Sequence, residues 1–315
     1  MTLDADLIVD NRRTRRKLTF WRAATVLVLI AAFLAIGSAM TKQGLLGSRS
    51  APHVARVNVT GMIQYEPKMI ELLKRVEDND AAKAVLVYID SPGGSTAGSE
   101  ALYNSLRRIS AKKPVVAQIG ALGASGAYVT ALGTDHIIAT KTSLVGSIGV
   151  LVQWAEFDKL IDNWGIRFQE VKTSPLKASP NGFEPASPEA KAALKALVDD
   201  SFIWFRDLVA ERRTLTDSEL KAVADGRVFT GRQSLDLKLI DEIGDEQSAK
   251  NWLINAKKID SKLPLELYKV EDQRLPNWLG AAARLAGLFG FSASWLSDVQ
   301  VSSSRLDGLV SVWQP

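Results

Sequence analysis

Two kinds of apolar pattern, one typical of strands and one typical of helices, alternate along the middle of the chain. Residues 54–63 alternate between apolar and polar positions, residues 83–90 form a nearly continuous apolar run, and residues 114–120 form another. Between these runs, residues 69–79 and 97–110 carry apolar side chains at the three- and four-residue spacing of a helix. Continuous apolar runs are typical of strands that are buried on both faces of a parallel sheet. The pattern therefore predicts an α/β fold in which crossover helices connect parallel strands.

Helical patterns dominate the next part of the chain. Residues 187–213 have helical spacing throughout and begin with serine, proline and glutamate, which are typical of a helix N-terminus. Shorter helices are predicted at 216–226 and 231–244, and short strands at 135–140 and 147–152.

The N-terminal part of the chain has a different pattern. Residues 23–40 carry no charge, and as a helix they would be about 27 Å long, close to the thickness of a bilayer's hydrocarbon core. A basic block at 11–17 precedes them, and Trp21 and Arg22 lie where interfacial anchors occur. We therefore predict a transmembrane anchor with a cytoplasmic N-terminus. A cleaved signal peptide and a buried helix of a soluble protein are the alternatives.

Composition is that of a globular protein, with 46% hydrophobic and 23% charged residues, and much of the net charge of +4 lies near the N-terminus. The basic block flanks the predicted anchor, so we expect no nucleic-acid partner. The amphipathic stretch 277–296 has a tryptophan near each end; it could pack in the core, contact another subunit or lie on a membrane surface. The expected parts are a basic cytoplasmic N-terminus (1–22), an anchor (23–40), a linker (41–53), the main folded domain (54–257) and a C-terminal extension (258–315).

The chain has no cysteine and only two histidines. Disulfides, thiolate nucleophiles and cysteine-ligated metals are therefore excluded. The histidines do not have the spacing of a catalytic metal site, and no GK[ST] follows the glycines of "DSPGGS" to make a phosphate-binding loop. We expect no metal and no cofactor.

A candidate nucleophile lies in the turn "GASGAY". Ser125 stands there between a predicted strand and a predicted helix, although most serines in such turns only cap the helix. Gly93 and Gly94 follow the strand at 83–90, and they would present backbone N–H groups at the carboxyl edge of the sheet. Ligands bind at that edge in open α/β folds. The two motifs together favour a site for nucleophilic catalysis there.

A serine hydroxyl needs a base that removes its proton. His53 follows the predicted anchor closely, and His136 begins a short strand, where a lone histidine is more often structural. The polar, proline-rich loop at 171–190 carries Lys172 and Lys177. A lysine becomes a base when burial in an apolar pocket lowers its pKa toward neutrality. This loop is therefore the best place to look for the base.

Five segments, taken in order and spacing, resemble one known family. They are "YIDSPGGSTAGSEALYNSLRRI", "GALGASGAYVTAL", "TSLVGSIGVLVQW", "VKTSPLKASPNGFEPASPEA" and "VADGRVFTGRQSLDLKLIDEIG". Together they are similar to the signal peptide peptidase A (SppA) family of membrane-anchored serine proteases, in its short single-domain form, over roughly Val54–Trp252. The "SPGG" element alone would also suit Clp protease or the crotonases. The resemblance implies a ClpP/crotonase-like β-β-α superhelix fold with an N-terminal transmembrane helix.

The resemblance also implies a Ser/Lys dyad. Ser125 matches the nucleophile and Lys177 the general base, with Lys172 as the fallback because the register of the loop is open. Ser147 matches a serine that orients the lysine amine. In a single-domain chain, the nucleophile and the base are expected to come from the same chain.

The backbone N–H groups of Gly93, Gly94 and Gly126 resemble the family's oxyanion donors. Arg227 and Gly231 match a further family segment, in which we interpret them as structural rather than catalytic.

The function that the resemblance implies is an endopeptidase for cleaved signal peptides and other short hydrophobic peptides. It implies a ring-like homo-oligomer that contacts the bilayer through the anchor, in the bacterial inner membrane, with a periplasmic catalytic domain. A crotonase-like acyl-CoA enzyme and a non-catalytic membrane scaffold are the alternatives.

Overall fold

The computed structural model describes a continuous stretch, residues 51–270, and a few positions outside it. These are Lys17, residues 20–22 and 24–25, and the backbone of residues 310–312.

The chain divides into two compact units, residues 1–52 and 53–315. The predicted anchor at 23–40, apart from 24–25, and the amphipathic stretch at 277–296 lie outside the described residues. Within the described part of the chain, no helix combines the length and the apolar character that a membrane span requires.

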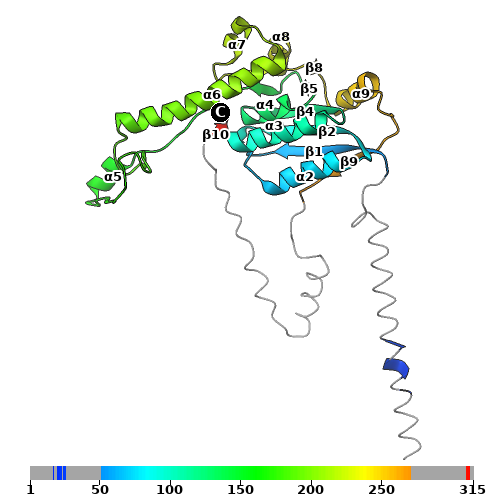
Figure 1. Cartoon of the computed structure of the whole chain (residues 1–315), viewed down its shortest axis with the longest axis horizontal. Helices are drawn as coiled ribbons and strands as arrows, with labels where there is room; N and C mark the ends of the chain where they lie inside the picture. Colours follow the sequence, from blue (N-terminus) through cyan, green and yellow to red (C-terminus); the bar gives the residue numbers. More distant parts are fainter. Residues whose placement is uncertain (1–16, 18–19, 23, 26–50, 271–309, 313–315) are drawn as a thin grey trace, which may run out of the picture. The chain divides into compact units, whose positions relative to one another are not determined.

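A mixed sheet of eight strands forms the centre of the second unit (Figure 1). Its order is β7-β6-β4-β2-β1-β9, and β5 lies beside β4 with β8 beside β5. The strands are parallel except for β6 and β7, which pair antiparallel. A separate two-stranded sheet joins β3 and β10. The strands are β1 His53–Thr60, β2 Ala82–Ser91, β3 Gly93–Ser95, β4 Val115–Ala124, β5 His136–Ala139, β6 Leu144–Gly146, β7 Val228–Thr230, β8 Glu242–Ile243, β9 Leu265–Tyr268 and β10 Val310–Val312.

Alternate residues of the central strands face two separate apolar cores. In β2, Val85, Val87 and Ile89 belong to the larger core, which helices α2, α3, α4, α6 and α7 complete. Ala84 and Leu86 face the smaller core under α9. Both faces of the sheet are therefore covered, as the continuous apolar runs predict. The helices are α2 Pro67–Asp78, α3 Thr96–Ser110, α4 Gly126–Leu132, α5 Asp158–Asn163, α6 Pro188–Arg213, α7 Asp217–Val223, α8 Gly231–Asp236 and α9 Glu246–Lys257.

The cap of the longest helix is as expected from the sequence. Ser187 precedes α6, and its side chain accepts a hydrogen bond from the backbone N–H of Ala190 at 3.1 Å.

Two other expectations about the sheet differ from the structure. The predicted strand at 147–152 is replaced by β6, which ends at Gly146 because Gly146 and Ser147 have φ of +97° and +50°. These angles are incompatible with a continued strand. β9 adds to the sheet beside β1, so the sheet includes residues that the sequence pattern assigned to the C-terminal extension.

A projecting segment, residues 155–187, includes α5 and is here called the arm. It connects directly to the N-terminus of α6, and Figure 1 shows α5 at the end of α6 that lies away from the sheet. After Ala190, the first buried side chain of α6 is Phe205. The two residues are 15 positions apart, so the N-terminal end of α6, where the arm joins it, lies about 22 Å from the first fully buried core residue of the helix.

Candidate active site

Ser125 occupies a strained turn between β4 and α4. Its φ is +57° and its ψ is −122°, a conformation that costs energy for a residue with a side chain. Its N–H donates to the Gly146 carbonyl at 2.7 Å, and its carbonyl accepts from the N–H groups of Tyr128 and Val129. Its side chain is 1% exposed and makes no capping bond to α4. The turn therefore presents this hydroxyl at the carboxyl end of β4 for a purpose other than helix capping.

The backbone of the glycine motif lies against this turn. A Cβ atom added to Gly126 would lie 3.2 Å from the Gly94 nitrogen and 2.2 Å from Ser99 Oγ. A Cβ atom on Gly94 would lie 1.8 Å from the Ile63 carbonyl oxygen. Both positions thus require glycine, and the Gly126 backbone, next to Ser125, packs closely against the Gly94 amide. Backbone N–H groups in such an arrangement can stabilise a developing oxyanion.

Gly93 differs from Gly94 in its partners. Its φ is +103°, and its N–H donates to Ser91 Oγ at 3.1 Å. Of the two adjacent glycines, Gly93 thus shapes the turn while its amide is already engaged.

The outer edge of β3 is paired with a strand. The Gly93 carbonyl and the Ser95 N–H both bond to Ile63 at 2.8 Å, on the inner side of β3. Because backbone groups alternate in direction along a strand, the polar groups of Gly94 face the opposite side. There β10 pairs antiparallel with β3, with Ser311 opposite Gly94, and β10 also contacts α4. The structure therefore shows a short extended segment accommodated next to the nucleophile turn.

Ser147 lies close to Ser125 because it directly follows Gly146 at the end of β6. It follows Gly146, whose carbonyl receives the Ser125 N–H. Its own N–H donates to the Arg227 carbonyl at 2.8 Å, and its side chain is 7% exposed. A Cβ atom on Gly231 would lie 2.0 Å from the Thr140 carbonyl oxygen, so that glycine serves close packing. The Arg227 backbone and Gly231 thus contribute to packing next to β6 and β7.

Both histidines lie at the opposite end of the sheet from Ser125. His136 pairs with Val116, which precedes Ser125 by nine residues, or about 30 Å along an extended strand. Its ring stacks on Trp252 at 4.7 Å between ring centroids, and its Nε2 lies 3.2 Å from Glu242. Neither this ring nor the second one can accept the serine proton.

His53 is the second histidine. It begins β1 opposite Ala82, is fully buried, and has its Nε2 2.9 Å from the Tyr268 hydroxyl. Its contacts are those of a structural core histidine.

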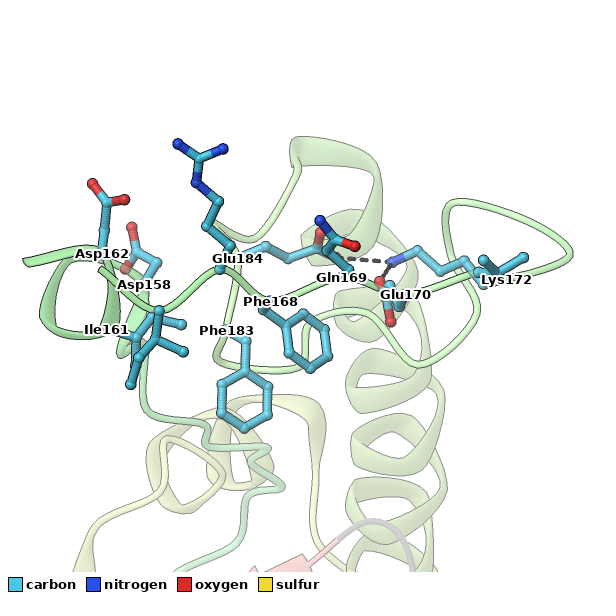
Figure 2. A pocket seen from close by; sticks show the side chains of 12 residues that line it. Asp158, Ile161, Asp162, Phe168, Gln169, Glu170, Lys172, Phe183 and Glu184 are labelled. Carbon is cyan, nitrogen blue, oxygen red and sulfur yellow. Dashed lines mark hydrogen bonds and ion pairs between the residues drawn. The ribbon is translucent and has the colours of Figure 1, made fainter. Parts of the chain in front are cut away.

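The two candidate lysines are both on the arm, with different surroundings. Lys172 forms ion pairs with Glu170 and, at 2.8 Å, with Glu184 (Figure 2). Hydrogen bonds to these two carboxylates raise the pKa of Lys172 above its usual value. Lys172 is thus held in its charged form and is poorly suited to be a base. Lys177 lies in an exposed turn, where its N–H donates to the Ser174 carbonyl at 3.1 Å.

The arm folds mainly on itself. The rings of Phe168 and Phe183 stack with 4.7 Å between their centroids (Figure 2). The Phe157 N–H donates to the Gly182 carbonyl. Arm residues alone line the hollow in Figure 2. The structure thus gathers Ser125, Ser147 and the three glycines at one place, and it puts Lys177 on a separate part of the molecule.

The sequence pattern missed one feature of this site. Two glycines and a proline in residues 91–95 are typical of a turn, whereas the structure shows the strand β3 at Gly93–Ser95.

Comparisons with known proteins show the family of the chain. The model of peptidase family S49 matches residues 107–260, and the Clp protease model matches residues 56–145. A putative protease of Synechocystis sp. is 37% identical over 223 residues, which cover 70% of this chain and 80% of that protein.

A putative signal peptide peptidase SppA of Enterococcus faecium is 26% identical, with 76% of this chain and 74% of that protein covered. Protease 4 of Haemophilus influenzae is 30% identical over 57% of this chain, but only 29% of that longer protein is covered. The strand order, the glycine-rich strand beside Ser125 and these matches lead to one conclusion: the fold is that of a ClpP-like protease, and the chain belongs to the SppA family, peptidase family S49.

Proposed function

We propose that the protein is a serine endopeptidase with Ser125 as its nucleophile. The observation that carries this proposal is the strained Ser125 turn packed against the Gly94 amide. A positive φ at a serine is kept only when the surroundings impose it, and such strain gathers at functional sites. The amides of Gly94 and Gly126 are the proposed oxyanion donors. Gly93 shapes the same turn, but its amide is engaged by Ser91.

Lys177 is the proposed general base, supplied by a neighbouring subunit. Neither histidine lies near Ser125, and Lys172 is ion-paired. Of the two histidines and two lysines considered as the base, Lys177 is therefore the best candidate. The arm carries Lys177 at the end of α6 that lies away from the sheet. Lys177 of a second copy could therefore reach Ser125 more readily than Lys177 of the same chain. This differs from the single-chain dyad expected from the sequence.

The apolar surface of the arm supports this arrangement. Large hydrophobic side chains are exposed on the arm and just before it, and patches of this kind mark interaction sites. A ring of subunits would cover the patch and bring each arm to the next Ser125. In the covered site Lys177 would be shielded from water and could approach the neighbour's Ser125 hydroxyl. The exposed side chains are Trp154, Phe157, Leu160, Trp164, Ile166, Phe168, Val171, Leu176 and Phe183.

The reaction follows from these roles. Neutral Lys177, oriented by Ser147, takes the Ser125 proton as Oγ attacks the carbonyl carbon of a peptide bond. The amides of Gly94 and Gly126 stabilise the oxyanion. The lysine then donates its proton to the departing amine, and water hydrolyses the acyl-enzyme ester.

The proposed substrates are extended peptides that pair with the outer edge of β3. β10 occupies that edge as a strand, which supports this binding mode. By analogy with the relative named a signal peptide peptidase, cleaved signal peptides and other short hydrophobic peptides are the expected class. An anchor at 23–40 would hold the enzyme in the bacterial inner membrane with this domain on the periplasmic side.

A fluorophosphonate probe tests the proposal directly. It should label the full-length chain at Ser125, and Ser125→Ala should lose both the label and peptidase activity. A folded wild-type protein that reacts with no such probe would instead support a non-catalytic scaffold. Acyl-CoA retained by the purified protein would favour the crotonase alternative.

A further inference from the structure

We propose that Asp90 is a positioning residue for this reaction, because its carboxylate sets the register between the nucleophile turn and β3. The proposal rests on the peptidase function proposed above, and it adds a residue to which no role has been given so far.

The pairing of β2 with β4 changes register immediately before the site. The two strands pair residue for residue up to Ile89 and Ile119, but the next pair is Ser91 with Gly123. The step from Ile89 to Ser91 is two residues, and the step from Ile119 to Gly123 is four, so β4 carries two extra residues. Such a bulge re-aims the chain that follows it and is often found next to active sites.

Asp90 lies opposite the bulge, and its carboxylate accepts a backbone N–H of β4 that the interrupted strand pairing leaves without a strand partner. Its Oδ1 accepts the Leu122 N–H at 3.1 Å, and its Oδ2 accepts the Tyr88 hydroxyl at 3.4 Å. Burial, more than the nearby carboxylate, raises the pKa of Tyr88, so the hydroxyl stays a donor. The Asp90 carbonyl is fixed as well, because it accepts the Gly61 N–H at 3.2 Å. The carboxylate is thus aimed at one backbone amide of the bulge.

The two halves of the site both start from this contact. Ser125 comes three residues after Leu122, and Gly94 comes four residues after Asp90. The Asp90–Leu122 bond therefore fixes the distance between the nucleophile and the oxyanion amide. A displacement of about 1 Å at a reacting group can cost on the order of 100-fold in rate.

The chain offers a matched control at the other end of the same strand. Asp135 Oδ2 accepts the Val115 N–H at 2.9 Å, which is the same kind of bond from a carboxylate to a β4 amide. Val115 is the first residue of β4 and lies far from Ser125. Loss of this bond should lower stability without moving the site.

The experiment compares Asp90→Ala, Asp90→Asn, Asp135→Ala and wild type as full-length proteins. We expect Asp90→Ala to lower kcat by about 10- to 100-fold with KM little changed, and to slow fluorophosphonate labelling of Ser125 in proportion. Asp90→Asn keeps an oxygen that can accept the Leu122 N–H, so it should recover most of the rate. Asp135→Ala should keep wild-type kcat at temperatures well below its melting point.

Hydrogen exchange gives a readout that does not depend on activity. Amides of residues 118–125 should exchange faster in Asp90→Ala than in wild type, but not in Asp90→Asn or Asp135→Ala. Equal kcat in Asp90→Ala and wild type, or equal losses in Asp90→Ala and Asp135→Ala, would overturn the proposal. If wild type itself is unreactive, the peptidase function fails, and unchanged exchange in Asp90→Ala would separately refute the contact's role in register.

Discussion

The body around Ser125 and the arm that carries Lys177 differ in how their residues are bonded and buried. Both backbone groups of Ser125 are hydrogen-bonded, and this residue is 1% exposed. The arm is held by a pair of stacked phenylalanines and ion pairs, and it leaves many large apolar side chains exposed. The difference suggests that the body is complete by itself, whereas the arm requires a partner. The proposed dyad joins one member from each.

The largest contrast should come from the two arm lysines. Lys177→Ala should lower kcat by at least about 1,000-fold with the fold intact, because it removes the proposed base. Lys172→Ala removes only ion pairs on the arm and should keep activity within a few-fold of wild type. Steady-state hydrolysis of a peptide substrate, with circular dichroism as the check on folding, measures both. Comparable activity in the two variants would refute the assignment of the base.

The free energy of unfolding should also distinguish the body from the arm. Phe205 is 1% exposed where α6 enters the main core, and Phe205→Ala should cost about 3–5 kcal/mol. Trp164 is 72% exposed at the end of α5, and Trp164→Ala should change the free energy of unfolding by less than about 0.5 kcal/mol. Denaturant unfolding in dilute solution measures both. A large loss from Trp164→Ala under these conditions would mean that the arm is folded into the body.

The strand β10 allows a test of the substrate-binding edge. A peptide cannot pair with β3 while β10 does, so removal of residues 310–315 should lower KM by about 2- to 10-fold and leave kcat unchanged. Removal of residues 313–315 alone is the control, because β10 remains. If KM stays the same after the longer truncation, β10 does not compete with substrate.

The smallest effect on catalysis should come from His136. Its stacking on Trp252 lies at the opposite end of the sheet from Ser125, so His136→Ala should keep most activity and lose only some stability. A loss of about 1,000-fold in kcat without unfolding would point to a Ser/His pair instead.

Much of the body could be predicted from local pattern. The apolar runs place β1, β2 and β4, and the serine-proline-glutamate start places α6 with its Ser187 cap. Gly126 beside Ser125 and Gly94 identify the site because the backbones meet there at distances that exclude a side chain.

The features that sequence pattern missed depend on contacts between distant segments. The end of β6 depends on positive φ angles at Gly146 and Ser147, and β3 forms because it pairs with β10 and bonds to Ile63. The bulge opposite Asp90 leaves no periodic signal. The position of Lys177 on an arm away from Ser125 also leaves no signal in the sequence pattern. It depends on the first half of α6, most of which is not buried.

The most direct test of the central claim mixes two inactive variants. Ser125→Ala and Lys177→Ala, co-expressed at equal amounts, should regain about a quarter of wild-type activity, because one site in four of a ring would pair an intact serine with a neighbour's lysine. Wild type mixed equally with the double variant should also give about a quarter. A mixture of the two single variants with no activity, together with half the wild-type activity in the second mixture, would show that the dyad forms within one chain and would contradict the account.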